Sequence, residues 1–111
     1  MQHTMKLWDS PFCHIKSGSK TIEMRLMDEK RAKIAVGDCI LFTNAKTGET
    51  LTRSVKNLYV YPSFEELYRH HDKLSIGYTE NEIAKPEDML AYYSEEEIAR
   101  YGVVAIELQC L

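Results

Sequence analysis

The chain has few of the residues that would place it outside ordinary globular proteins. Its 111 residues include three cysteines, three prolines and five glycines, too few for a disulfide-rich scaffold, a collagen-like repeat or a proline-rich linker. No apolar run approaches the roughly 20 residues that cross a bilayer, and the first residues lack the apolar segment of a signal peptide. These absences predict one domain over residues 1–111, with no membrane partner and a cytoplasmic location.

Sites built on cysteine or histidine are not predicted either. Cys13, Cys39 and Cys110 are odd in number and widely spaced, so they suggest neither a disulfide framework nor a zinc site, and we expect them to pack as small apolar residues. His70 and His71 are adjacent, so on a helix they would not share a face, and we expect both at the surface. With no glycine-rich phosphate loop present, the sequence predicts no metal site and no organic cofactor.

Charge is distributed unevenly along the chain. The net charge of −3 argues against a protein that coats nucleic acid indiscriminately. Residues 1–62 carry ten Lys or Arg against six Asp or Glu, whereas residues 63–111 carry four against eleven. The basic half indicates a site for an anionic ligand, and the acidic half a surface for a basic protein partner. The alternative is that both halves are ordinary solvated surface.

The hydrophobic pattern predicts strands without a regular alternation of strand and helix, which excludes a doubly wound sheet. We therefore expect an α+β fold, a small mixed β-barrel of five or six strands with short helices at its ends. The expected strands share β-rich composition, alternation of apolar and polar residues, or a short apolar run, and they cover residues 3–8, 21–26, 39–42, 51–61 and 103–111.

Capping patterns mark the helices. We expect Ser10 as an N-cap with Pro11 at the first helical position, and Gly18 as the left-handed residue that ends this helix. Capping boxes of the form Ser-x-x-Glu begin at residues 63 and 94. Short helical segments are also expected at residues 28–35 and 86–93.

One segment, residues 18–25, carries the residues best suited to chemistry. Glu23 and Arg25 are two apart in an expected strand, so their side chains share a face about 7 Å apart. Lys20 lies at the mouth of that strand. A cation, a carboxylate and a guanidinium that converge on one pocket bind a phosphate and the edge of a base, or position groups for nucleophilic and acid–base chemistry. The alternative is a solvent-facing ion pair, which contributes only about 0–1 kcal/mol.

The same segment resembles the G-x-K-x-x-E-x-R motif of the ASCH domain family, with Gly18, Lys20, Glu23 and Arg25 in register. Four further stretches resemble the family in the same order along the chain. They are Pro-Phe-x-x-Ile from residue 11, G-D-x-I-x-F from residue 37, S-F-x-E-L from residue 63 and Y-G-V-x-A-I from residue 101.

This resemblance implies a PUA-like barrel whose cleft holds an RNA segment or a nucleotide-like molecule. The ligand-binding residues that it implies are Lys20, Glu23 and Arg25, and Thr21 of the same segment is a further candidate. Tyr59 and Tyr61 are further candidates, as platforms on which bases stack. The alternative for both tyrosines is ordinary packing in the barrel core.

The resemblance also leaves an enzymatic alternative open. Some bacterial ASCH-like proteins hydrolyse the amide of 4-acetylcytidine with a lysine, a threonine and a glutamate, and others have been proposed to cleave RNA. The Cys-Leu end at residues 110–111 is similar to that of the amidohydrolases. Lys20 matches the family's lysine, while Glu23 stands at the threonine position. As a small hydrolase, the chain would use Lys20 and Glu23 as its catalytic residues.

Overall fold

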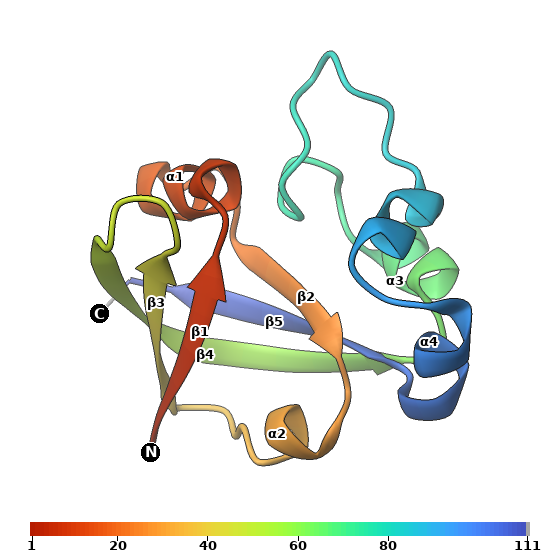
Figure 1. The fold of residues 1–111 in the computed structure, drawn as a ribbon, viewed down its shortest axis with the longest axis horizontal. Coiled ribbons are helices and arrows are strands. Elements are labelled where there is room, and N and C mark those ends of the chain that lie inside the picture. Colours follow the sequence, from red (N-terminus) through yellow and green to blue (C-terminus); the bar gives the residue numbers. More distant parts are fainter. Residues whose placement is uncertain (111) are drawn as a thin grey trace.

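The computed structural model describes residues 1–110 (Figure 1). Each expected strand is present, and a hairpin joins the third to the fourth. The strand expected to reach Leu111 ends at Gln109, and Leu111 lies outside the described residues. The elements are β1 (Gln2–Leu7), α1 (Asp9–Ser17), β2 (Ile22–Leu26), α2 (Glu29–Ala32), β3 (Cys39–Asn44), β4 (Thr50–Tyr61), α3 (Phe64–His70), the 3₁₀ helix η1 (Pro86–Ala91), α4 (Glu95–Tyr101) and β5 (Val103–Gln109).

The strands form one curled sheet in the order β1-β3-β4-β5-β2. β1 pairs with β3 in parallel, and the other neighbours are antiparallel. β1 and β2 are the edge strands, so within residues 1–110 the barrel is a half-barrel with an open seam. Arg25 of β2 crosses this seam, because its Nη2 donates a hydrogen bond to the Lys6 carbonyl of β1 at 3.0 Å. The α+β prediction is confirmed, with five strands.

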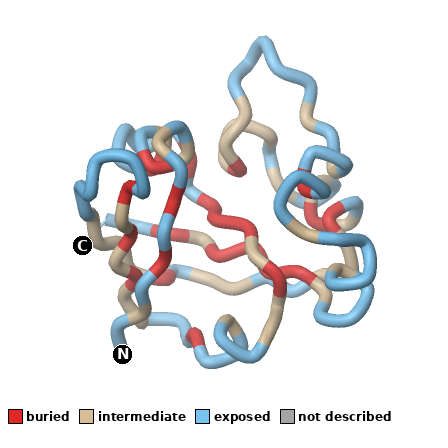
Figure 2. Tube along the Cα trace, in the orientation of Figure 1, coloured by how far each residue is buried: buried red, intermediate tan, exposed pale blue. Residues whose placement is uncertain are grey.

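Two cores lie on the two faces of the sheet. The inner core fills the curl, and its largest buried side chains include Phe12, Ile40 and Phe42. The outer core lies between the sheet and the helices α3, η1 and α4, around Phe64 and Leu67. β5 is central between them, and Figure 2 shows its first residues buried. Burial on both faces explains why this strand begins with a continuous apolar run.

α1 begins two residues earlier than its sequence pattern suggests. Trp8 occupies the N-cap position with no side-chain hydrogen bond, and its carbonyl accepts from the Phe12 amide at 3.1 Å. The prediction of Ser10 as N-cap is therefore wrong, because Ser10 already lies inside the first turn. Gly18 ends the helix with a φ of 89°, as predicted. Only a residue without a Cβ adopts this left-handed conformation at little cost.

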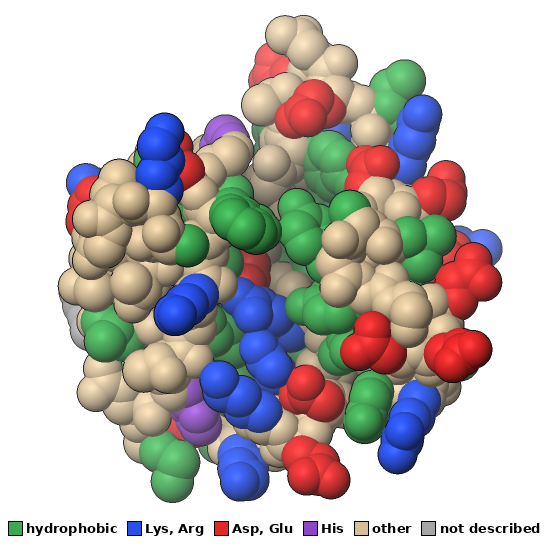
Figure 3. All heavy atoms as spheres, in the orientation of Figure 1, with side chains coloured by type: hydrophobic (Ala, Val, Ile, Leu, Met, Phe, Trp, Pro, Cys, Tyr) green, Lys and Arg blue, Asp and Glu red, His purple; other side chains and the backbone are tan. Residues whose placement is uncertain are grey.

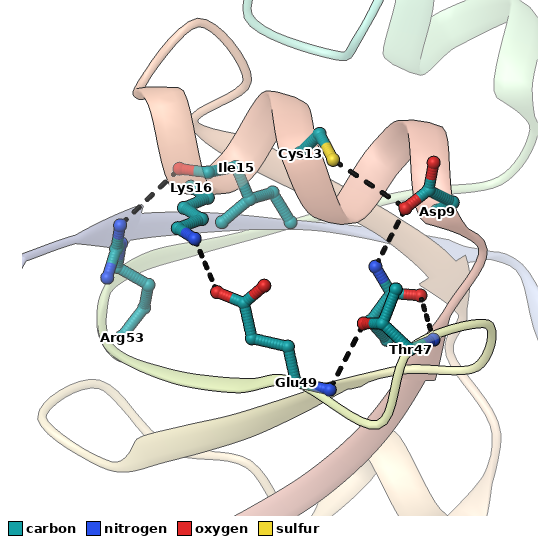
Figure 4. Close-up of polar contacts among 8 residues, drawn as sticks. Asp9, Cys13, Ile15, Lys16, Thr47, Glu49 and Arg53 are labelled. Atoms are coloured by element: carbon teal, nitrogen blue, oxygen red, sulfur yellow. Dashed lines mark hydrogen bonds and ion pairs between the residues drawn. The ribbon is translucent and has the colours of Figure 1, made fainter.

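Polar contacts fix α1 on the β3–β4 hairpin (Figure 4). Asn44 is 2% exposed, and a buried amide without partners would be costly. Its amide nitrogen donates to Asp9 at 2.9 Å, and its amide oxygen accepts two backbone amides of the turn. Arg53 of β4 donates to the Ile15 carbonyl at 3.4 Å. An ion pair between Lys16 and Glu49 adds a further, exposed link.

The capping boxes predicted for the later helices form to different extents. Ser94 and Glu97 form a complete capping box. Ser63 accepts from the Glu66 amide, but the Glu66 carboxylate pairs with Arg69 instead of returning to the cap, so this box is half formed. The segment predicted as a helix over 86–93 is a 3₁₀ helix that ends at Ala91.

The prediction of buried cysteines is wrong for Cys13 and Cys110, which are exposed, while Cys39 is half-buried. Cys13 lies on the outer side of α1, where its thiol contacts Asp9 at 3.7 Å. In residues 1–110, no helix has the length and apolar character needed to cross a membrane.

Candidate functional site

The chain enters β2 through a tightly held turn. The Lys20 amide donates to the carbonyl of His14 in α1 at 3.0 Å. The amides of Thr21 and Ile22 both donate to the Ser75 carbonyl at 2.9 Å. Residues distant in sequence therefore fix the backbone of the motif from both sides. Lys20 consequently lies in this turn, two residues before β2, and its side chain is directed to the same opening as that of Glu23.

Lys20, Glu23 and Arg25 form one connected ion-pair group, which we call the triad. Lys20 Nζ lies 2.9 Å from Glu23 Oε1, and Arg25 Nε lies 2.7 Å from Glu23 Oε2. Lys20 is 8% exposed and Glu23 is 4% exposed. The alternative of a solvent-facing ion pair is therefore excluded for Glu23. The sequence placed Glu23 and Arg25 on one face, and the structure adds that one carboxylate lies between two cations.

Glu23 remains ionised in this setting. Burial is the largest single influence on the pKa of Glu23 and raises it. The charges of Lys20 and Arg25 and their hydrogen bonds lower this pKa, and their combined effect is larger than that of burial. The net effect is a pKa below the usual value of a glutamate. The triad thus holds two cations and one anion, and it presents a net positive charge.

The triad opens into a cleft of about 480 Å³. One wall consists of β1, the start of α1 and β2, and includes Lys6 beside the triad. The opposite wall consists of α3, the loop at 71–85, and η1 with the residues after it. Figure 3 shows Lys and Arg side chains gathered in this hollow, with hydrophobic side chains on both flanks and most acidic groups over the helical half. The uneven charge distribution of the sequence therefore places the basic side chains of the cleft on the barrel wall, while the opposite, helical wall contributes Glu82 and Asp88.

A glycine lets Lys20 lie flat against the loop wall. Gly77 has a φ of 113°, and a Cβ at this position would lie 3.2 Å from Lys20 Cδ. A larger residue would be strained and would press on the lysine stem. Gly77 is thus part of the site, although no sequence pattern distinguished it.

Sequence reasoning also missed the aromatic and hydroxyl groups of the cleft. Trp8, the one tryptophan of the chain, is 67% exposed, and Tyr92 is 59% exposed. Trp8 lines the cleft directly before α1, and Tyr92 lines it directly after η1. On the helical wall, the hydroxyls of Tyr68 and Tyr78 lie 2.9 Å apart. An exposed tryptophan directly before a helix was the one available signal.

Three of the predicted ligand-binding residues lie outside this cleft. The Thr21 side chain is exposed and does not line it. Tyr59 and Tyr61 pair with residues of β5 that belong to the outer core, on the other face of the sheet from the triad. There the Tyr59 hydroxyl donates to Glu107 at 3.1 Å, and the Tyr61 hydroxyl lies 2.8 Å from His71 Nε2. The structure therefore brings together Lys20, Glu23 and Arg25 but not the two tyrosines.

Over the described range 1–110, no group of three or more His, Cys, Asp or Glu side chains lies close enough together to hold a metal ion.

Comparisons with known proteins agree with this architecture. The family model for the ASCH domain matches residues 5–111. Hypothetical protein PH0355 is 35% identical over 100% of both chains, with a TM-score of 0.84. Protein PF0455 from Pyrococcus furiosus is also 35% identical, with a TM-score of 0.74, over 100% of this chain and 98% of its own. No match is found among curated proteins.

A mutant of the ASCH protein from Zymomonas mobilis shares 14% identity with a TM-score of 0.68, over 97% of this chain and 68% of its own. At that identity the similarity is one of fold alone. The half-barrel with short helices at its ends agrees with the PUA-like fold that the resemblance implied. Taken with the match over residues 5–111, these findings show that the chain belongs to the ASCH domain family.

Proposed function

We propose that this chain binds RNA or a nucleotide-like ligand in the cleft, with the triad as the site for its phosphate. The observation that carries the proposal is a buried group of net positive charge that opens into a hollow of about 480 Å³. Hollows of roughly 300–1,000 Å³ with a few convergent polar groups are typical of small-ligand sites.

The charged groups of the triad suit a phosphate. Glu23 holds Arg25 by Nε, and the Lys6 carbonyl holds it by Nη2. Within residues 1–110, Arg25 Nη1 has no hydrogen-bond partner, so its protons are available to a ligand. A guanidinium held in this way loses little freedom when it binds an anion. Lys6 and Lys20 line the same cleft and add positive charge.

The exposed aromatic side chains suit a base. Trp8 and Tyr92 line the cleft from its barrel wall and its helical wall, respectively, and are largely exposed. Stacking of a base on an aromatic ring contributes about 1–3 kcal/mol. Unpaired bases stack in this way, whereas bases within a duplex are already stacked. We therefore propose a single-stranded RNA segment or a free nucleotide as the ligand.

The state of Glu23 favours binding over catalysis. Both carboxylate oxygens are paired with cations, and its pKa is lowered once the two charges outweigh burial. A general acid needs the opposite shift, because it must hold its proton near neutral pH. Turnover remains a separate prediction from the resemblance. Incubation with 4-acetylcytidine and with a short RNA tests it, and product formation that Lys20→Ala abolishes would support a hydrolase.

Trp8 provides a direct test of binding. We expect CMP and a short single-stranded RNA to change its fluorescence on titration, with weaker affinity at higher salt. Lys20→Ala should weaken binding by roughly tenfold or more, since a hydrogen bond to a charged group contributes about 1.5–3 kcal/mol. Lys56→Ala is the matched control, because Lys56 is exposed on β4 and outside the cleft.

Unchanged fluorescence and no heat of binding at low salt would exclude the proposal. Equal affinity of the Lys20→Ala variant and the wild type, with both folded by circular dichroism, would remove the triad from the binding site.

A further inference from the structure

The helical wall of the cleft contains a chain of hydrogen bonds that the proposed phosphate site does not use. The Tyr78 hydroxyl lies 2.8 Å from Asp88 Oδ2 and 3.3 Å from the Lys85 carbonyl oxygen. The Tyr68 hydroxyl lies 2.9 Å from that of Tyr78. Three of these residues, Tyr68, Tyr78 and Asp88, line the cleft.

The direction of this chain follows from the groups at its end. An ionised carboxylate and a backbone carbonyl accept hydrogen bonds and do not donate them. The single proton of Tyr78 is therefore directed to Asp88 and Lys85. Tyr68 must supply the proton of the bond between the two tyrosines. Burial, followed by this bond, raises the pKa of Tyr68, so Tyr68 stays protonated and its oxygen offers only acceptor lone pairs.

Other groups of this wall have the same character. Glu82 lines the cleft, and one of its carboxylate oxygens accepts from the Thr79 amide at 2.8 Å. Lys73 donates to the Glu80 and Glu82 carbonyls at 2.9 and 2.7 Å, which holds the loop in place. The wall opposite the triad thus combines two carboxylates with a hydroxyl that accepts.

The two walls suit chemically different ends of one ligand. The barrel wall donates hydrogen bonds to an anion, and the helical wall accepts hydrogen bonds from a donor. A nucleobase with an exocyclic amino group supplies such donors at the end away from its phosphate. A base that lacks the amino group leaves the acceptors of the wall without a partner, which costs binding free energy.

We propose that the cleft selects nucleotides whose base carries an exocyclic amino group, recognised by the acceptor wall of Tyr68, Glu82 and Asp88. This inference rests on the proposed function, since it specifies the ligand of the same cleft.

Ligand pairs that differ only in the amino group test the inference on the wild-type protein. One pair is AMP and purine riboside 5′-monophosphate, and the other is CMP and its 4-deamino analogue. We expect each amino compound to bind about tenfold more tightly, the factor that corresponds to about one hydrogen bond. Calorimetry and Trp8 fluorescence both measure this ratio.

A variant tests the hydroxyl chain itself. Tyr78→Phe removes the acceptor to which Tyr68 donates, so the Tyr68 proton is released to face the ligand. The ratio between amino and deamino compounds should then fall, because Tyr68 no longer accepts from the amino group. Tyr101→Phe is the control and should keep the full ratio, because Tyr101 lies in α4 and does not line the cleft.

The outcomes separate the two proposals. Equal affinity for both members of each pair would overturn the amino selectivity and leave nucleotide binding in place. Failure of all four compounds to bind would overturn the proposed function on which the selectivity rests. A Tyr78→Phe variant that is folded and keeps the full ratio would remove the hydroxyl chain as the cause.

Discussion

At the residue scale, Glu23 connects the stability of the chain to its site. Its carboxylate is 4% exposed and lies between Lys20 and Arg25. Arg25 in turn reaches across the seam to the Lys6 carbonyl. Loss of the carboxylate would leave two cations next to each other in a place with little water, while the guanidinium would lose one of its two anchors.

Glu23→Gln should therefore destabilise the protein by about 3 kcal/mol near neutral pH, since removal of one partner from a buried ion pair leaves the other uncompensated. Urea denaturation measures this free energy. Glu66→Gln is the matched control, because the Glu66–Arg69 pair is exposed and should contribute less than about 1 kcal/mol. Equal losses in the two variants would show that burial of the triad has no energetic consequence.

The same variant predicts a pH dependence. Burial raises the pKa of Glu23, but the two cations outweigh it and the folded-state pKa lies below the usual 4.5. The stability due to ionised Glu23 is therefore fully present above pH 4.5 and is lost as pH falls through the lowered value. The difference in the free energy of unfolding between the wild type and Glu23→Gln should become smaller in that acidic range. If this difference in the free energy of unfolding stayed constant through the acidic range, the lowered pKa of Glu23 would be contradicted.

Residue-scale prediction from sequence reached one wall of the site. Lys20, Glu23 and Arg25 lie close together along the chain, so strand periodicity alone placed two of them on one face. Gly77, Tyr68 and Asp88 come from distant segments, and no local pattern shows which distant residues will face the motif. Tyr59 and Tyr61 were grouped with the site by residue type, but their strand presents them to the other face of the sheet.

At the element scale, the ends of helices show where local patterns decide structure. In α4 the capping box forms fully, because Ser94 and Glu97 are exposed and have no competing partners. In α1, tertiary contacts override the N-cap pattern at Ser10 and Pro11. Asp9 at the helix start is engaged by Asn44 of the hairpin, and the helix begins there. Of these two helix starts, the local signal therefore held where its residues are exposed and failed where a distant strand supplied the partner.

Two serine variants measure this difference. Ser94→Ala should cost about 1 kcal/mol in the free energy of unfolding, because it removes a cap that satisfies the Glu97 amide. Ser10→Ala should leave stability nearly unchanged, since Ser10 caps nothing. Thermal and urea denaturation of the two variants provide the comparison. A larger loss for Ser10→Ala than for Ser94→Ala would mean that α1 begins at Ser10 after all.

At the scale of the whole molecule, the cleft exists because the half-barrel is open. β1 and β2 are edges of one sheet, and the helices α3 and η1 stand across from them. The class of fold followed from the irregular order of strands and helices and from the resemblance of five motifs. The parallel pairing of β1 with β3 could not be predicted from the sequence, because pairing between distant strands depends on tertiary contacts that a single sequence does not display.

The central claim is that a nucleotide occupies this cleft with its phosphate at the triad. Chemical-shift mapping by NMR during titration with CMP tests it most directly, since each amide reports its own surroundings. We expect the largest shifts at Lys20, Glu23, Arg25 and Gly77, together with the indole N–H of Trp8. Shifts confined to Tyr59, Tyr61 and His71 on the other face of the sheet, or no shifts at all, would contradict the account.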